Sequence, residues 1–157
     1  MFCLPQNFKL VTGANPKTSN GGFTGAYVSV KEVQMAWLVV EMTQAVANAT
    51  QITPVQATAV AGTGATALTV TVPIWSNLDV SVNDTLVERT AALNYAVTAS
   101  AKNMLVVIQI DPRTMGSGYD VLGFTVSDST QATNFVAATW VLQTRYAQAT
   151  PPTAVTD

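Results

Sequence analysis

Three apolar, β-branched runs in the C-terminal third of the chain decide the fold: NMLVVIQIDPR at 103–113, VLGFTVSD at 121–128 and FVAATWVLQTRY at 135–146. Short stretches rich in Gly, Pro, Asp and Ser separate them, which is typical of consecutive strands joined by turns. Alternate side chains of a strand share one face. The apolar faces are Leu122, Phe124 and Val126 in the second run, and Val136, Ala138, Trp140 and Leu142 in the third. We expect these two faces to form the middle of a sandwich core.

Earlier stretches predict further strands. Met35–Met42 is apolar on both faces, which predicts a central strand covered on both sides. Ile52–Val60 alternates, but Pro54 has no N–H to donate, so we expect this strand to lie at a sheet edge or to begin after the proline. Gly62-Thr63-Gly64 indicates a tight turn. Leu68–Trp75 is predicted as one half-buried strand, with a core face and a threonine face.

Shorter runs near 26–30, 85–89 and 95–99 raise the total to roughly eight or nine strands, which predicts an all-β, single-domain antiparallel β-sandwich of jelly-roll-like type. We expect residues 1–25 to form an extended N-terminal arm or edge strand, because prolines and a Gly-Gly turn interrupt them. Residues 26–146 are then the sandwich domain, and 147–157 a flexible C-terminal tail. If the first segment is an arm, removal of residues 2–15 should leave the domain folded.

Charge is scarce in this sequence. Only 10% of the 157 residues are charged, against about 25% in typical globular proteins, and the net charge is −2. Two explanations stay open: a threonine-rich β-domain, or a surface partly covered by neighbouring subunits, which we favour because interface cores are depleted in charge. The basic residues are scattered, so we expect no direct nucleic-acid binding. The apolar runs are far shorter than the roughly 20 residues that cross a bilayer, so we expect no membrane partner.

The sequence lacks the usual catalytic and metal-binding patterns. It has no histidine and one cysteine, Cys3, which argues against His-dependent nucleophiles and the common zinc sites. Two carboxylate pairs are candidates for a glycosidase cleft or a calcium site: Asp79 with Asp84, and Asp111 with Asp120. Neither has the dense acidic spacing of a calcium loop, and Asp111 more simply starts a turn. We therefore predict a non-enzymatic protein without catalytic, cofactor-binding or metal-binding residues.

Aromatic residues offer another class of function. Trp75, Tyr95 or Tyr119 would form the platform of a carbohydrate-binding module that adheres to a host surface. Core packing or subunit contact is the other explanation for these rings, and we favour it.

Three further motifs are GAYVSVK at 25–31, QATAVAGTGATAL at 56–68, and the series IQID at 108–111, GYDV at 118–121 and YAQ at 146–148. Together they resemble a family of small proteins encoded among the head genes of tailed bacteriophages. The second motif is close to that family's Gln-Ala-Thr-x-Val-Ala-Gly-Thr-Gly-x-x-Ala-Leu signature. The resemblance spans about residues 21–148 and departs at 43–50, where the family has a Gly/Asp-rich turn.

The resemblance implies a phage virion structural protein. Low charge, the apolar N-terminal segment and the small β-domain favour a capsid decoration (cement) protein on the outer capsid surface, synthesised in the host cytoplasm. Its expected partners are the major capsid protein and further copies of itself, as a homodimer or homotrimer. The predicted contact residues are Phe2, Leu4, Phe8, Leu10, Arg145 and Tyr146. Two alternatives stay open: a neck, tail or baseplate component, and the carbohydrate-binding module.

Overall fold

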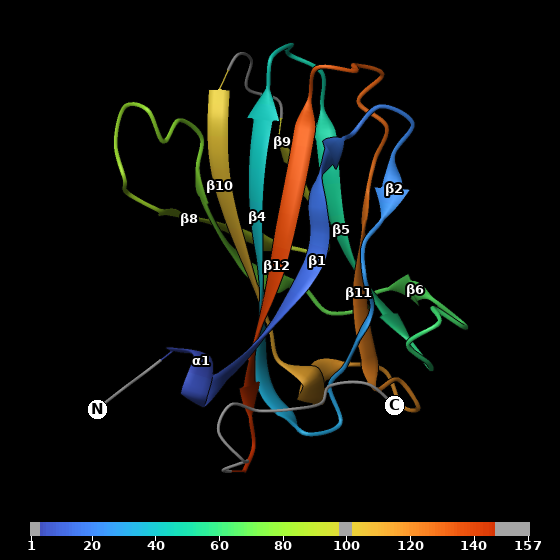
Figure 1. Cartoon of the computed structure of the whole chain (residues 1–157). Coiled ribbons are helices and arrows are strands. Elements are labelled where there is room, and N and C mark those ends of the chain that lie inside the picture. The colour runs from blue at the N-terminus through green and yellow to red at the C-terminus, as the bar shows by residue number, and fades with distance from the viewer. Residues whose placement is uncertain (1–3, 98–101, 147–157) are drawn as a thin grey trace.

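A computed structural model describes residues 4–97 and 102–146, in which two antiparallel six-stranded sheets pack face to face (Figure 1). Among these residues, helical structure is limited to α1 (Leu4–Asn7) and the 3-10 turn η1 (Pro112–Thr114). The predicted all-β sandwich is therefore confirmed.

The larger strands gather in sheet A, which has the order β1-β12-β4-β10-β7-β8. Its strands are β1 (Phe8–Thr18), β4 (Val33–Gln44), β7 (Val72–Asn77), β8 (Val87–Ala92), β10 (Lys102–Ile110) and β12 (Phe135–Thr144). Sheet B is built on the pair β5 (Thr50–Ala57) and β11 (Val121–Val126). Its short outer strands are β2 (Phe23–Thr24) and β3 (Val28–Ser29) beside β11, and β6 (Thr66–Ala67) and β9 (Tyr95–Val97) beside β5.

The chain alternates between the two sheets as it runs from β1 to β12. The strands β1-β12-β4-β10 of sheet A lie over β2/β3-β11-β5-β9 of sheet B, with β7 and β8 extending sheet A beyond β10. Two four-stranded layers linked in this alternating order form a jelly roll. The jelly-roll-like topology is thus confirmed as well.

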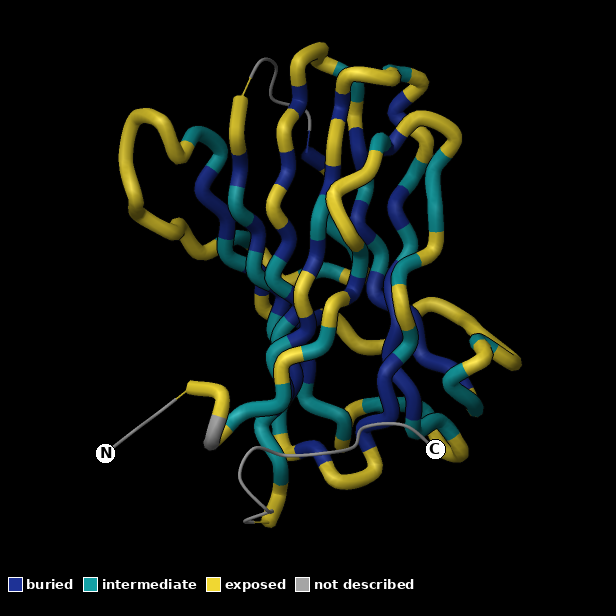
Figure 2. The backbone as a smooth tube through the Cα atoms, viewed as in Figure 1, coloured by how far each residue is buried: buried dark blue, intermediate teal, exposed yellow. Residues whose placement is uncertain are grey.

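The centre of the core is an aromatic contact between the sheets. Phe124 on β11 and Trp140 on β12 are fully buried, with ring centroids 6.0 Å apart in an edge-to-face arrangement. The indole Nε1 of Trp140 donates to the backbone oxygen of Ala26 at 3.2 Å, so its polar atom is satisfied. A Cβ at Gly25 would overlap the Phe124 ring, so a glycine is needed there. Figure 2 shows the buried residues alternating along the central strands.

The three C-terminal runs are strands, as predicted, and their apolar faces do meet in the core. They do not, however, form neighbouring strands of one sheet. β10 and β12 lie on either side of β4 in sheet A, whereas β11 belongs to sheet B. The turns between them therefore cross from one sheet to the other.

The predicted strand Leu68–Trp75 is wrong as a continuous element. Leu68 and Val72 are buried, but Val70 between them is 45% exposed, because the chain leaves sheet B after β6 and enters sheet A at β7. Strand β5 also differs from expectation, since it begins before Pro54 and lies inside sheet B. On the side of β5 away from β11, β9 pairs with the residues up to Ile52 and β6 pairs from Val55 onwards. Pro54 lies in the gap between these two partners, where no strand needs the N–H that proline lacks.

Strand β4 has the predicted central position, but only one of its faces is buried. Ala36, Leu38 and Val40 point into the core. Trp37 and Val39 on the other face are half-buried, and no layer formed by residues 4–97 and 102–146 covers them.

Residues 8–18 are β1, an edge strand paired along β12 with two register shifts near Ala14. Such irregularities, with Pro16 in the same strand, protect an edge from further pairing. Removal of residues 2–15 would take away most of this strand, so that truncation would disturb the sandwich. Removal of residues 2–6 would spare it.

Loss of the central aromatic contact should be costly. We predict that Phe124→Ala lowers the free energy of unfolding by about 3–5 kcal/mol, because it leaves a cavity between the sheets. Phe135→Ala is the matched control, since Phe135 is 47% exposed, and it should cost less than about 1 kcal/mol. Urea denaturation followed by circular dichroism measures both. Equal losses in the two variants would contradict the assignment of the core centre.

Candidate functional site

The most distinctive surface is the side of sheet A that faces away from sheet B, here called the outer face. Its side chains are largely apolar although they lie outside the core. The apolar ones are Phe8 and Leu10 on β1, Met35, Trp37 and Val39 on β4, Trp75 on β7, Leu105 and Val107 on β10, and Val141 on β12. The polar residues Thr12, Thr139 and Gln109 lie in the same rows. Antiparallel sheets with one wet side usually carry polar residues there, so this face is unusual.

The strand register arranges these side chains in rows across the sheet. One row runs from Leu10 through Val141 to Trp37, and the next runs from Val39 through Val107 to Trp75. Phe8 packs edge-to-face on Trp37 at 5.9 Å between ring centroids. The Trp37 Nε1 donates to Gln109 Oε1 at 3.2 Å, which fixes the indole on the sheet. The lower half of the outer face is therefore an aromatic ridge.

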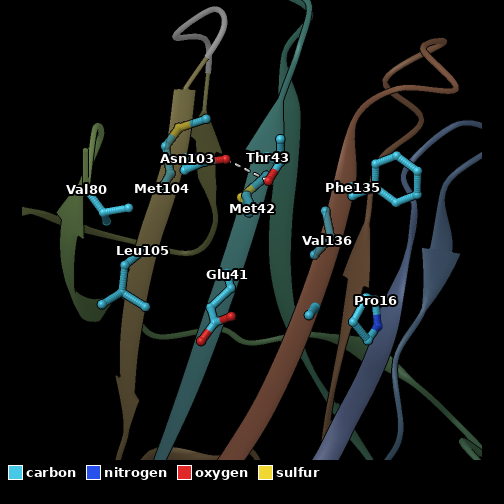
Figure 3. A pocket seen from close by; sticks show the side chains of 11 residues that line it. Pro16, Glu41, Met42, Thr43, Val80, Asn103, Met104, Leu105, Phe135 and Val136 are labelled. Carbon is cyan, nitrogen blue, oxygen red and sulfur yellow. Dashed lines mark hydrogen bonds between the residues drawn. The ribbon is translucent and has the colours of Figure 1, made fainter. Parts of the chain in front are cut away.

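The upper half of the outer face is hollowed. A hollow of about 400 Å³ lies over β12, β4 and β10, with Phe135, Val80 and Leu105 among its walls (Figure 3). A smaller hollow of about 170 Å³ adjoins it towards β1, and Pro16, Glu41 and Ala137 line both.

Glu41 is the one ionisable side chain among the described residues that line either hollow. Beside it, the Thr43 hydroxyl donates to Asn103 Oδ1 at 2.8 Å, so these polar groups satisfy each other. A hollow with one exposed carboxylate and apolar walls suits contact with a protein surface better than chemistry on a bound substrate.

The predicted contact residues fall into two groups. Phe8 and Leu10 belong to the outer face as parts of β1, not to a free arm. Leu4 is 46% exposed in α1, and Tyr146, which is 70% exposed, follows the end of β12. Because Phe8 pairs with Gln143, the start of β1 and the end of β12 lie together at the lower end in Figure 1. Phe2 lies outside the described residues.

Arg145 is held against the sandwich at this lower end. Its Nε donates to the backbone oxygen of Val33 at 3.0 Å, and its backbone N–H donates to the backbone oxygen of Glu32 at 2.8 Å. Leu4, Arg145 and Tyr146 together are called the basal end below.

Three of the four candidate carboxylates lie beside basic side chains. Asp79 pairs with Lys102 at 2.5 Å, and Asp111 pairs with Arg113 at 2.6 Å. Each pairing, through a side-chain hydrogen bond, holds the pKa of the aspartate below its usual value. Asp111 also accepts from the Arg113 backbone N–H, as expected for a turn, and Asp120 lies 3.5 Å from Lys31. No group of three metal-ligating side chains occurs within the described part of the chain.

The three rings suggested for glycan binding do not share a surface. Trp75 is on the outer face, whereas Tyr95 packs against the core and its hydroxyl bonds with the inward Ser76 hydroxyl at 2.8 Å. Tyr119 lies in the loop before β11, against Gly116. These three rings therefore do not combine into one aromatic platform, and glycan binding through any one of them stays a prediction.

Comparisons with known proteins place few constraints on the chain. No protein-family model matches it, and no curated protein matches its sequence. Among solved structures, the SPBc2 prophage-derived protein YomS is similar, with a TM-score of 0.47 and 13% identity over 86% of this chain and 91% of that one. A similarity at this level does not establish a shared function. None of the helices within 4–97 and 102–146 is long and apolar enough to span a membrane.

One carboxylate ties two loops at the upper end. Asp128 Oδ1 accepts from the backbone N–H groups of Thr130 at 2.6 Å and Gly21 at 2.7 Å. These bonds, Thr130 first, lower the pKa of Asp128 below its usual value. The stability that they contribute is present above the unfolded-state pKa of about 3.9 and is lost as pH falls through the lower folded-state pKa.

We therefore predict that Asp128→Asn, which keeps an acceptor oxygen without a titrating proton, loses less stability than the unmodified protein between about pH 5 and pH 2. Thermal melts at low salt, where surface charges are least screened, measure this difference. Parallel pH profiles for the two proteins would show that the Asp128 contacts do not form in solution.

Proposed function

We propose that this protein is a structural protein of a tailed-phage virion that decorates the outside of the capsid. The resemblance to phage head proteins over about residues 21–148 supports the phage context. The scarcity of charge supports an assembly role, because little electrostatic repulsion keeps neighbouring subunits apart.

The observation that carries the proposal is the apolar outer face of sheet A, together with the exposed apolar side chains at the basal end. A monomer of this size exposes single apolar residues without consequence, but contiguous apolar surfaces mark interaction sites. The outer face is one such surface. At the basal end, the exposed Leu4 precedes β1 and the exposed Tyr146 follows β12, and these two strands pair with each other.

In this proposal the basal end contacts the major capsid protein, and further copies of the chain contact one another. A protein that binds only the assembled shell stabilises that shell by its binding free energy. When linked copies bind together, the second contact forms at a raised effective concentration, which strengthens attachment without any new contact type. The protein thus acts by binding alone and requires no catalytic group.

Co-sedimentation tests the proposal. Purified protein is mixed with capsids that lack it and, separately, with isolated tails. We expect saturable binding to capsids only, with a stoichiometry that matches a symmetry axis. Binding only to tails would support a tail or baseplate component, and binding to neither would overturn the proposal and direct attention to host glycans.

A matched pair of variants tests the contact residues. The double substitution Leu4→Ser with Tyr146→Ser should weaken capsid binding by about tenfold or more, since central apolar contacts each contribute more than about 1 kcal/mol. Val82→Ser is the control, because Val82 is 74% exposed on the loop after β7, away from the basal end. Unchanged binding of the double variant would assign the capsid contact to another surface.

A further inference from the structure

The outer face has a pattern that one chain alone does not explain. At the centre of sheet A, the outward positions of β4 and β10 carry Trp37, Val39, Leu105 and Val107, all half-buried. Residues of this size on a solvated sheet lose favourable burial energy of about 25 cal/mol per Å² that a covering layer would recover. Aligned sheet-on-sheet packing is the ordinary way to cover such a face.

We infer that the outer face of sheet A packs against the same face of a second copy, about a two-fold axis that runs across the strands at the level of Val39. This inference deepens the proposed function by assigning the surface through which copies of the chain associate. The two basal ends then lie outside this interface, at opposite ends of the dimer.

The shape of the outer face is complementary to itself in this arrangement. Rotation about an axis across the strands keeps β4 opposite β4 but reverses the direction of the strands. The aromatic ridge at Trp37 and Phe8 then lies opposite the larger hollow of the partner copy, which begins at the row of Glu41. Because the axis is two-fold, the same contact forms twice, and the aromatic ridge of each copy enters the larger hollow of the other.

Charge selects this axis over the other one. A two-fold axis along the strands would keep every row at the same level, and the two Glu41 carboxylates would approach each other in an apolar interface. Like charges in such a place are strongly unfavourable. With the axis across the strands at Val39, each Glu41 lies instead at the level of the partner copy's Trp37, one row beyond the axis.

The area of the face is sufficient for a stable dimer. Five neighbouring strands about 4.8 Å apart, each about nine residues long at about 3.4 Å per residue, cover about 700 Å². A standard stable interface buries roughly 800 Å² on each partner. The apolar central rows and the polar rim, with Thr43, Asn103 and Gln143, follow the usual anatomy of such an interface.

Paired charge variants at Val39 test both the surface and the axis. Because Val39 meets its own copy at the axis, Val39→Asp and Val39→Lys should each be monomeric in analytical ultracentrifugation, while the unmodified protein sediments as a dimer. A one-to-one mixture of the two variants should restore the dimer, since opposite charges then meet. Val46→Asp, on the exposed loop after β4, is the control and should stay dimeric. Thermal melts confirm that each variant is folded.

Three results would overturn the inference: a monomeric or trimeric unmodified protein, dimers of Val39→Asp alone, or a mixture that stays monomeric. The measurement contains no capsids, so it is separate from the test of the proposed function. A monomer that still binds capsids would remove this interface and leave the decoration role standing. A dimer that binds no capsid would do the reverse.

Discussion

The contact between Phe124 and Trp140 is the constraint on which the rest of the structure depends. It joins β11 of sheet B to β12 of sheet A at the centre of the core. Phe23 extends it edge-to-face at 6.5 Å, and the Trp140 indole holds the segment at Ala26 that leads from β2 to β3. Because both rings are large and fully buried, the spacing of the sheets follows from their size.

Much of this fold follows from the alternation of apolar residues, and the limits of that pattern are equally clear. A two-residue period identifies a strand and its core face, as it does for Val136–Leu142. It contains no information on which strand lies alongside, so it does not predict that β10, β11 and β12 alternate between the two sheets. The same limit explains why Leu68–Trp75 is wrongly predicted as one strand: the apolar alternation continues through the segment that crosses from sheet B to sheet A. The sequence predicts an edge position or a later strand start at Pro54, because a gap between two short partner strands leaves no pattern in the sequence.

The apolar character of the outer face is predictable from the sequence, but the position of its hollows is not. The run Met35–Met42 is apolar on both faces and predicts cover on both sides, yet the described part of the chain covers only one side. The outward residues of β10, Leu105 and Val107, carry the same signal within an unbroken apolar run. The position of the hollows was not predictable, because they arise where small residues of β12, such as Ala137, lie between larger ones on neighbouring strands. A second copy would reconcile the two-sided pattern with the one-sided burial.

Electron cryo-microscopy of phage particles that contain the protein tests the central claim most directly. The account predicts sandwich-shaped density outside the capsid shell, with one basal end of each dimer against the major capsid protein. The larger sheets of its two copies should lie face to face with their strands running in opposite directions. Density confined to the neck, tail or baseplate, or sandwiches attached to the shell through the outer face of sheet A, would contradict it.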